Sequence, residues 1–258
     1  MIDLRYDLIV AVAEKKVNFY NKDKLAYFIS SSLAGMYVGI CMVLINVMAA
    51  SLGNIGSLKM LQGVSFAAAL SLVVFAGAEL FTGNVFVMFA GVKCGAVKFS
   101  DALGLTVFCY IGNLAGSIFI ASLFLWTGFL QGPVLTAVSY AIDAKTNPVF
   151  MELFFRGILC NIFVCLAVWC AYRMTSESGK FIAILCCIYI FVVCGFEHSI
   201  ANMTLFSMGL VSRGEGIASL GSMLNNLAAS SLGNLLGGLM LSLAYWTIGR
   251  RVPSVAKS

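Results

Sequence analysis

The residues with the most evident chemistry lie in the segment Gly195-Phe196-Glu197-His198, inside the apolar run 181–210. His198 is the only histidine among 258 residues, and Glu197 directly precedes it. Ionisable side chains are costly at the depth of a membrane, so such a pair inside an apolar run indicates a functional site. Because the unperturbed pKa of histidine is about 6.5, His198 is suited to exchange a proton near neutral pH. The alternative interpretation is structural: polar side chains that only hold helices together.

Composition shows what kind of scaffold must hold this pair. The chain is 61% hydrophobic and 10% charged, with a mean hydropathy of +0.98, whereas soluble domains have about 25% charged residues. Uncharged stretches at 25–58, 102–142 and 216–249 are each long enough for the roughly 20 residues that a membrane-spanning helix needs. We therefore predict an all-α, polytopic membrane protein.

The sequence lacks the motifs of metal-binding, disulfide-bonded, nucleotide-binding and hydrolytic proteins. The nine cysteines are scattered through apolar runs without a CxxC motif or a Cys/His cluster, so we predict core residues rather than metal ligands or disulfides. No nucleotide-binding loop, Gly-x-Ser-x-Gly or HExxH motif occurs. We expect no metal, no cofactor, no catalytic residue and no nucleic-acid partner; the net charge of +5 is explained by loop lysines and arginines. The first residues lack the features of a signal peptide.

The apolar runs predict an amphipathic helix at 3–19 and then six membrane spans. The spans are expected at about 27–49, 64–90, 102–129, 149–172, 181–208 and 223–248. The segment 130–147 is predicted to be a polar loop, because it carries Gly and Pro. The domain prediction is one transmembrane channel domain over 1–258, with an N-terminal helix and connector (1–24), two repeats (25–129 and 148–248) and a basic tail (249–258).

The distribution of positive charge predicts the orientation. If both ends are cytoplasmic, the inside segments hold 12 lysines and arginines and the outside loops hold 3, with Arg156 inside span 4. Cytoplasmic loops carry the excess of Lys and Arg in membrane proteins. Six spans and two cytoplasmic termini agree with this count.

Spans 2 and 5 are interrupted by the same motif. Gly77-x-Glu79-x-x-x-x-Asn84 matches Gly195-x-Glu197-x-x-x-x-Asn202, 118 residues later. A second motif repeats in the same order, since Gly112-Asn113-Leu114-x-Gly116 in span 3 matches Gly233-Asn234-Leu235-x-Gly237 in span 6. Three spans per copy make the two repeats inverted, and inverted repeats with broken helices mark a transport pathway.

The breaks have a physical consequence. Glycine lets the chain leave helical geometry, and each half-helix that restarts presents unpaired N–H groups and a positive dipole end. Two such ends facing one site would attract an anion. We expect Asn84 and Asn202 to cap or pin these ends, and Thr82 to lie opposite His198.

At these residues the chain resembles the formate/nitrite transporter family. The resemblance rests on the segments 80–83, 153–161, 196–206 and 233–234, covers nearly the whole chain, and is strongest to the nitrite-channel branch. It implies a homopentamer in a bacterial cytoplasmic membrane, each protomer with its own pore in an aquaporin-like arrangement. It also implies a set of pathway residues: His198, Thr82, Asn161, Asn234 and, at the cytoplasmic mouth, Lys16. Two apolar constrictions are implied at Phe66, Leu80 and the nearby Phe81, and at Phe191. Arg156 departs from the pattern, where lysine is expected.

The predicted function is a channel or transporter for a small monovalent anion of a weak acid, with nitrite first and formate or hydrosulfide as alternatives. A bare anion crosses an apolar ring with difficulty, so His198 is expected to supply a proton, or else only a hydrogen bond. The charged residues Glu79, Glu197, Glu152 and Arg156 are predicted to be structural, with Glu152 and Arg156 paired at i,i+4. An intramembrane enzyme using His198 and Ser199 is the remote alternative, because adjacent helical residues point about 100° apart.

Overall fold

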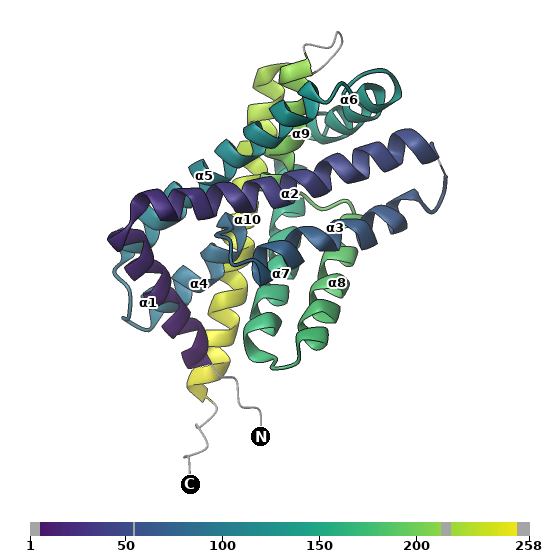
Figure 1. Ribbon diagram of the computed structural model, residues 1–258. Coiled ribbons are helices and arrows are strands. Elements are labelled where there is room, and N and C mark those ends of the chain that lie inside the picture. The colour runs from purple at the N-terminus through teal and green to yellow at the C-terminus, as the bar shows by residue number, and fades with distance from the viewer. Residues whose placement is uncertain (1–5, 54, 213–217, 252–258) are drawn as a thin grey trace.

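A computed structural model of the chain describes residues 6–53, 55–212 and 218–251, and within them all regular structure is α-helical. The described residues form ten helices, whose arrangement can be followed in Figure 1. Their bounds are α1 Tyr6–Lys22, α2 Lys24–Leu52, α3 Leu58–Phe75, α4 Phe81–Lys93, α5 Phe99–Trp126, α6 Gly132–Thr146, α7 Phe150–Arg173, α8 Glu177–Val193, α9 Ser199–Ser212 and α10 Leu220–Arg251.

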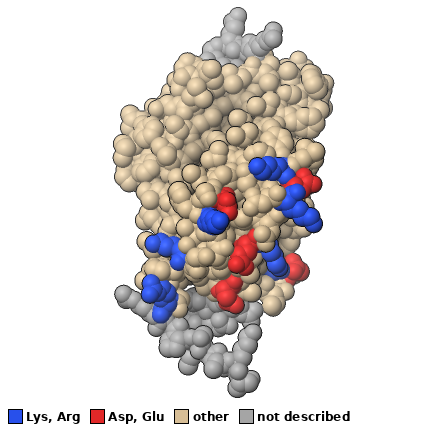
Figure 2. All heavy atoms as spheres, turned by 90° about the vertical axis from the view of Figure 1, so that its left-hand side faces the viewer, with Lys and Arg blue, Asp and Glu red and all other residues tan. Residues whose placement is uncertain are grey.

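Five of these helices, α2, α3, α5, α7 and α10, are long and apolar enough to cross a membrane, and α4 and α9 are shorter apolar helices. The start of α1 and the end of α10 lie together at one end of the molecule, while α6 lies at the other (Figure 1). On the face shown in Figure 2, charged side chains gather toward the end that carries α1, and the upper part of that face is uncharged. This distribution fits a multi-pass membrane protein.

Small residues set the distance between the main helix pairs. A Cβ atom on Gly116 of α5 would run into the Ser32 carbonyl of α2, and one on Gly237 of α10 would run into the Ile158 carbonyl of α7. The two repeated Gly-Asn motifs therefore sit at equivalent crossings, α2 with α5 and α7 with α10. Helices that approach this closely in a membrane use glycine at the contact.

The N-terminal helix packs against the bundle. Ile9, Ala13 and Val17 are buried at four-residue spacing along α1, so its apolar face covers α4 rather than facing solvent. The amphipathic helix expected at 3–19 is therefore present as α1, Tyr6–Lys22. Residues 3–5 of the prediction lie outside the described residues.

The prediction of a loop at 130–147 is wrong, because this segment contains the helix α6. Pro133 lies in the first turn of α6, where its fixed φ and missing N–H favour helix initiation. Val138 and Ile142 are buried four residues apart, which is the helical spacing that the Gly-Pro start concealed.

Replacing Gly116 with alanine should destabilise the α2–α5 pair. The added Cβ meets backbone atoms of Ser32 and Met36, which cannot move as a flexible side chain can, so we expect a loss of about 1–3 kcal/mol. Thermal unfolding of the purified protein in detergent measures the effect. Gly104→Ala on the same helix is the control, because its Cβ would meet only the Tyr20 hydroxyl at 3.6 Å; equal stability of the two variants would contradict the packing argument.

Candidate functional site

Two short non-helical segments interrupt the helical chain in the same way. Residues 76–80 separate α3 from α4, and residues 194–198 separate α8 from α9. Gly77 has φ of 74° and Gly195 has φ of 72°, a conformation that glycine adopts without strain. In both breaks, the N–H of the residue after the glycine donates to a carbonyl in the last turn of the preceding helix. Ala78 N donates to Val73 O at 2.9 Å, and Phe196 N donates to Phe191 O at 3.0 Å.

A side-chain amide from a neighbouring helix holds the second break. Asn234 of α10 donates through Nδ2 to the carbonyls of Glu197 at 2.8 Å and Gly157 at 2.9 Å. Its Oδ1 accepts from the N–H of Ser199, the first residue of α9, at 2.9 Å. One buried amide therefore joins the end of the break, the start of α9 and the backbone of α7.

Asn113 of α5 holds the first break with the same pattern. Its Nδ2 donates to the carbonyls of Ser31 at 2.7 Å and Glu79 at 2.9 Å, and its Oδ1 accepts from Phe81 N at 2.9 Å. We call Asn113 and Asn234 the clamp asparagines. The sequence motif contained both, but only Asn234 was expected at the pathway, so the role of Asn113 was missed although its match to Asn234 signalled it.

The clamp asparagines correct the expectation that Asn84 and Asn202 cap the half-helices. Asn84 instead donates to the Glu79 carboxylate at 2.9 Å, and Asn202 donates to the Glu197 carboxylate at 2.7 Å. They pin the side chains of the breaks rather than the helix ends.

The carboxylate of the first break is bound by a cation from the N-terminal helix. Lys16 Nζ lies 2.6 Å from Glu79 Oε1, and the Tyr27 hydroxyl donates to Oε2 at 3.1 Å. Burial acts to lower the pKa of Lys16, but the charge and hydrogen bond of Glu79 outweigh it and raise the pKa above its usual value. Lys16 is therefore a cation that is held in place.

The carboxylate of the second break is bound in the equivalent way. Lys145 Nζ, from α6, lies 3.0 Å from Glu197 Oε1, and Asn226 Nδ2 donates to Oε2 at 3.2 Å. The cations of the two break glutamates are therefore Lys16 and Lys145, and not Arg156. Arg156 bonds Glu152 at 3.3 Å as the predicted i,i+4 pair. Lys145 was missed because it lies on the segment that was predicted to be a loop.

His198 is buried between the two breaks and is held from both sides of its ring. The backbone N–H of Ala201 donates to Nδ1 at 3.2 Å, and Nε2 lies 3.2 Å from Thr82 Oγ1. Because Nδ1 accepts a hydrogen bond, the neutral ring carries its proton on Nε2. Phe191 stacks on the imidazole at 5.9 Å with an interplanar angle of 17°.

The remaining predicted polar residue, Asn161, supports this site from behind. Its Nδ2 donates to the carbonyls of Thr82 at 3.2 Å and Asn234 at 2.5 Å. It thus ties α7 to the residue that faces His198. Ser199, the partner in the enzyme alternative, has no hydrogen-bond partner for its Oγ within the described residues, so no Ser–His pair is formed.

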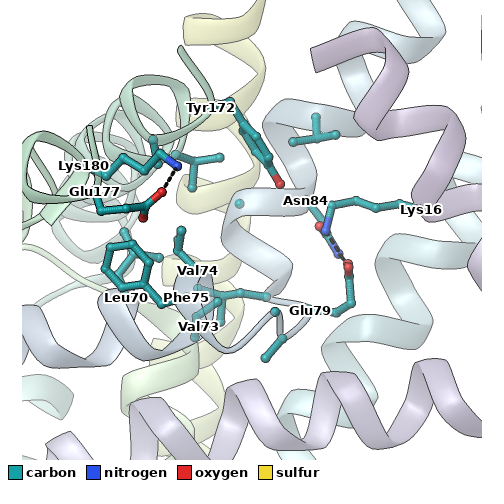
Figure 3. Close-up of a pocket in the computed structure, with 17 residues that line it drawn as sticks. Lys16, Leu70, Val73, Val74, Phe75, Glu79, Asn84, Tyr172, Glu177 and Lys180 are labelled. Carbon is teal, nitrogen blue, oxygen red and sulfur yellow. Dashed lines mark hydrogen bonds and ion pairs between the residues drawn. The ribbon is translucent and has the colours of Figure 1, made fainter. Parts of the chain in front are cut away.

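Two polar cavities lie on either side of an apolar neck. The α1-side cavity, about 420 Å³, is lined by Lys16, Glu79 and Asn84 among others. Figure 3 shows its two ion pairs, Lys16 with Glu79 and Lys180 with Glu177, on opposite walls. Its cations are therefore balanced by carboxylates.

The α6-side cavity, about 530 Å³, is more positive. Three cations line it, namely Lys59, Lys145 and Arg156, whereas Glu197 is the only carboxylate among its described lining residues. His198 lies at its inner end. An excess of fixed positive charge in a cavity with low-dielectric walls concentrates anions there.

The neck between the cavities encloses only about 10 Å³. Its lining includes three predicted constriction residues, Phe66, Leu80 and Phe191, together with His198. The rings of Phe66 and Phe191 meet edge to face at 6.2 Å. Phe81, also expected here, instead packs its ring on Tyr110 at 4.9 Å and lines none of these cavities.

Long apolar helices, two matched breaks and two polar cavities that meet at an apolar neck define a membrane channel or transporter. The sequence model of the formate/nitrite transporter family matches residues 5–247. The chain belongs to the formate/nitrite transporter family.

Individual relatives support the assignment. The chain is 40% identical to the nitrite transporter NirC of Escherichia coli K12, over 86% of this chain and 83% of that protein. It is 32% identical to the formate channel FocA of the same strain, over 95% and 96%. Among solved structures, it is similar to an FNT family ion channel with a TM-score of 0.89, 35% identity and coverage of 94% and 98%. A pentameric formate channel with formate bound gives a TM-score of 0.74, 28% identity and coverage of 86% and 96%.

Replacing Asn234 with leucine should be strongly destabilising. The change removes three hydrogen bonds of a buried residue and leaves backbone groups without partners, each of which costs about 1–3 kcal/mol. Asn225→Leu is the matched control, because Asn225 is exposed on the same helix. Thermal unfolding in detergent compares the two; a small, equal effect would show that the clamp is dispensable.

Replacing Lys16 with methionine should leave Glu79 buried without its cation. Removing one partner of a buried pair costs about 3–5 kcal/mol. The exposed neighbour Lys15→Met should change the unfolding temperature little, and Lys16→Met combined with Glu79→Gln should recover part of the loss.

The same pair predicts a pH dependence. Because the folded-state pKa of Lys16 is raised, its contribution is complete below the usual lysine value of about 10.4 and is lost as the pH rises through the raised value. The difference in unfolding temperature between wild type and Lys16→Met should therefore persist through neutral pH and, on the alkaline side, narrow only in strong alkali. Narrowing near neutral pH would contradict the assignment.

Proposed function

We propose that the chain is a channel for a small monovalent anion of a weak acid, with nitrite as its main substrate. The observation that carries the proposal is the apolar neck, which joins two polar cavities and has one hydrogen-bond donor, His198, on its wall. The relatives favour nitrite, because the nitrite transporter is 40% identical and the formate channel 32%. Formate and hydrosulfide remain the alternative substrates.

The proposed arrangement has six membrane spans in one channel domain. The α3–α4 and α8–α9 segments form the two broken spans, and residues 25–129 and 148–248 form inverted repeats. The matched contacts of the clamp asparagines support this assignment. The solved relative described as a pentameric formate channel supports a homopentamer. The positive-charge count supports cytoplasmic termini in a bacterial inner membrane.

Entry into the pathway is proposed to be electrostatic. Lys145 is paired with Glu197 and Arg156 with Glu152, so Lys59 leaves the α6-side cavity with an excess of positive charge. A monovalent anion is therefore concentrated next to the neck. Passage through the neck is unfavourable for a bare anion. The Phe and Leu side chains of the neck offer no hydrogen bonds in place of those that the anion loses when it leaves water. Desolvating a charge in such surroundings is prohibitive unless it is paired or neutralised.

His198 is proposed to lower this barrier. The Ala201 N–H fixes the neutral ring with its proton on Nε2, the nitrogen that faces Thr82 across the site. An anion that reaches the neck therefore meets an N–H donor and a hydroxyl. Hydrogen bonds to a charged group contribute about 1.5–3 kcal/mol each.

Proton coupling at His198 completes the proposal. An anion that crosses together with a proton passes the neck as a neutral acid, which avoids most of the desolvation cost. If the proton comes from an imidazolium, Nδ1 must carry a proton as well and must release the Ala201 N–H. If the acid arrives already neutral, the ring keeps its contacts and only donates a hydrogen bond.

Replacing His198 with asparagine should lower nitrite flux about tenfold or more, because the Nε2 donor at the neck is lost. Flux is measured in proteoliposomes over a pH series, in competition with formate and hydrosulfide. A relay through imidazolium predicts that the variant also loses the pH dependence of the wild type. A hydrogen-bonding role predicts lower flux with the same pH dependence.

Thr82→Val is the companion variant, since it removes the hydroxyl that faces Nε2 while keeping the shape of the side chain. It should reduce flux less than the histidine change. The proposal fails if His198→Asn leaves both the flux and its pH dependence intact while the protein remains folded and pentameric.

A further inference from the structure

Outside the pathway, two cations share one aromatic ring. Arg250 Cζ lies 4.8 Å from the centroid of the Trp246 ring, and Lys93 Nζ lies 5.3 Å from the same centroid. Trp246 and Arg250 belong to α10, and Lys93 ends α4. Lys93 also lies 5.8 Å from the ring of Phe89. Two cations from distant parts of the sequence thus lie on one half-buried indole.

Neither cation is paired with a carboxylate of the described residues. Lys16, Lys145, Arg156 and Lys180 form the ion pairs found in the described part of the chain, and Lys93 and Arg250 are not among them. Both side chains are exposed. An aromatic face attracts a cation but does not cancel its charge, so two cations on one ring form a site for an external anion.

An exposed apolar stripe leads to this pair. Leu236, Met240 and Leu243 follow one another at i, i+4 and i+7 on α10 and remain 38%, 49% and 42% exposed. The spacing places them on one face of the helix, and Arg250 continues that face seven residues after Leu243. An apolar strip that ends in an aromatic residue and two cations matches the order of layers in a membrane, from acyl chain to headgroup.

We propose that Lys93, Trp246 and Arg250 bind the phosphate of an anionic phospholipid, with one of its acyl chains lying on Leu243, Met240 and Leu236. A free phosphate would bind the two cations but would make no contact with the apolar stripe. The positively charged group of a zwitterionic lipid would be repelled by Lys93 and Arg250. The site is separate from the proposed anion pathway and does not depend on which substrate passes through it.

Native mass spectrometry of the delipidated, intact oligomer tests the proposal. Phosphatidylglycerol and phosphatidylcholine with the same acyl chains are titrated in parallel. We expect tighter binding of phosphatidylglycerol to the wild type, and a loss of roughly twentyfold in the Lys93→Ala/Arg250→Ala variant, given about fivefold for each basic residue near anionic lipid. Trp246→Leu should weaken the preference in the same direction.

Lys22→Ala/Lys98→Ala is the control, because it removes the same charge from two exposed lysines elsewhere and should leave the lipid preference unchanged. Unfolding temperatures without lipid verify that each variant is folded. The proposal is overturned if the two double variants lose the preference equally, if phosphatidylcholine binds the wild type as tightly, or if inorganic phosphate at equal concentration displaces the lipid. An unchanged preference in Lys93→Ala/Arg250→Ala would also overturn it.

Discussion

The structure depends on one constraint: unwound backbone inside a membrane must have its polar groups satisfied by protein, because lipid offers no partners. The clamp asparagines meet this requirement with one donor–acceptor amide at each break. Each must lie within hydrogen-bond distance of a second helix as well as of the break. That reach requires close helices, so Gly112 and Gly116, and Gly233 and Gly237, flank the clamps where a Cβ would collide with the facing helix. The Gly-Asn motif is therefore one device, in which glycine brings the helix near and asparagine binds across the gap.

The same constraint explains the two peripheral helices. Each break carries a buried glutamate, and a buried carboxylate needs a cation and further donors. No long apolar helix supplies that cation. α1 provides Lys16 for Glu79 and α6 provides Lys145 for Glu197, so two amphipathic helices at opposite ends of the molecule become part of the wall of the pathway. Without the cations of α1 and α6, each cavity would have an unpaired buried carboxylate in its wall, which would repel an anion.

The sequence predicted the class of protein, both breaks and the pairing of the two Gly-Asn motifs, because hydropathy and glycine spacing are local signals. The family assignment is confirmed by the family match and the relatives. Lys145 and α6 were missed because a short amphipathic helix that begins with Gly-Pro resembles a loop. The exchange of roles between Asn84 and Asn113 could not be predicted, since both are buried asparagines near the first break and only the helix crossing decides which one reaches the backbone.

The repeat also shows where the chemistry lies. In the matched breaks, Leu80 occupies the position of His198, directly after the glutamate, and both side chains line the neck. Leu80 has no atom that can cap its half-helix, and the first N–H of α4, on Phe81, is bound by Asn113 of a neighbouring helix instead. His198 accepts the Ala201 N–H through Nδ1, so the helix that follows orients the ring and directs Nε2 across the site toward Thr82. The two breaks are thus alike in their supporting contacts but differ at this one position, which is leucine in the first break and histidine in the second. The two breaks supply the same support, and the single exchange of leucine for histidine turns one side of an apolar neck into a hydrogen-bond donor.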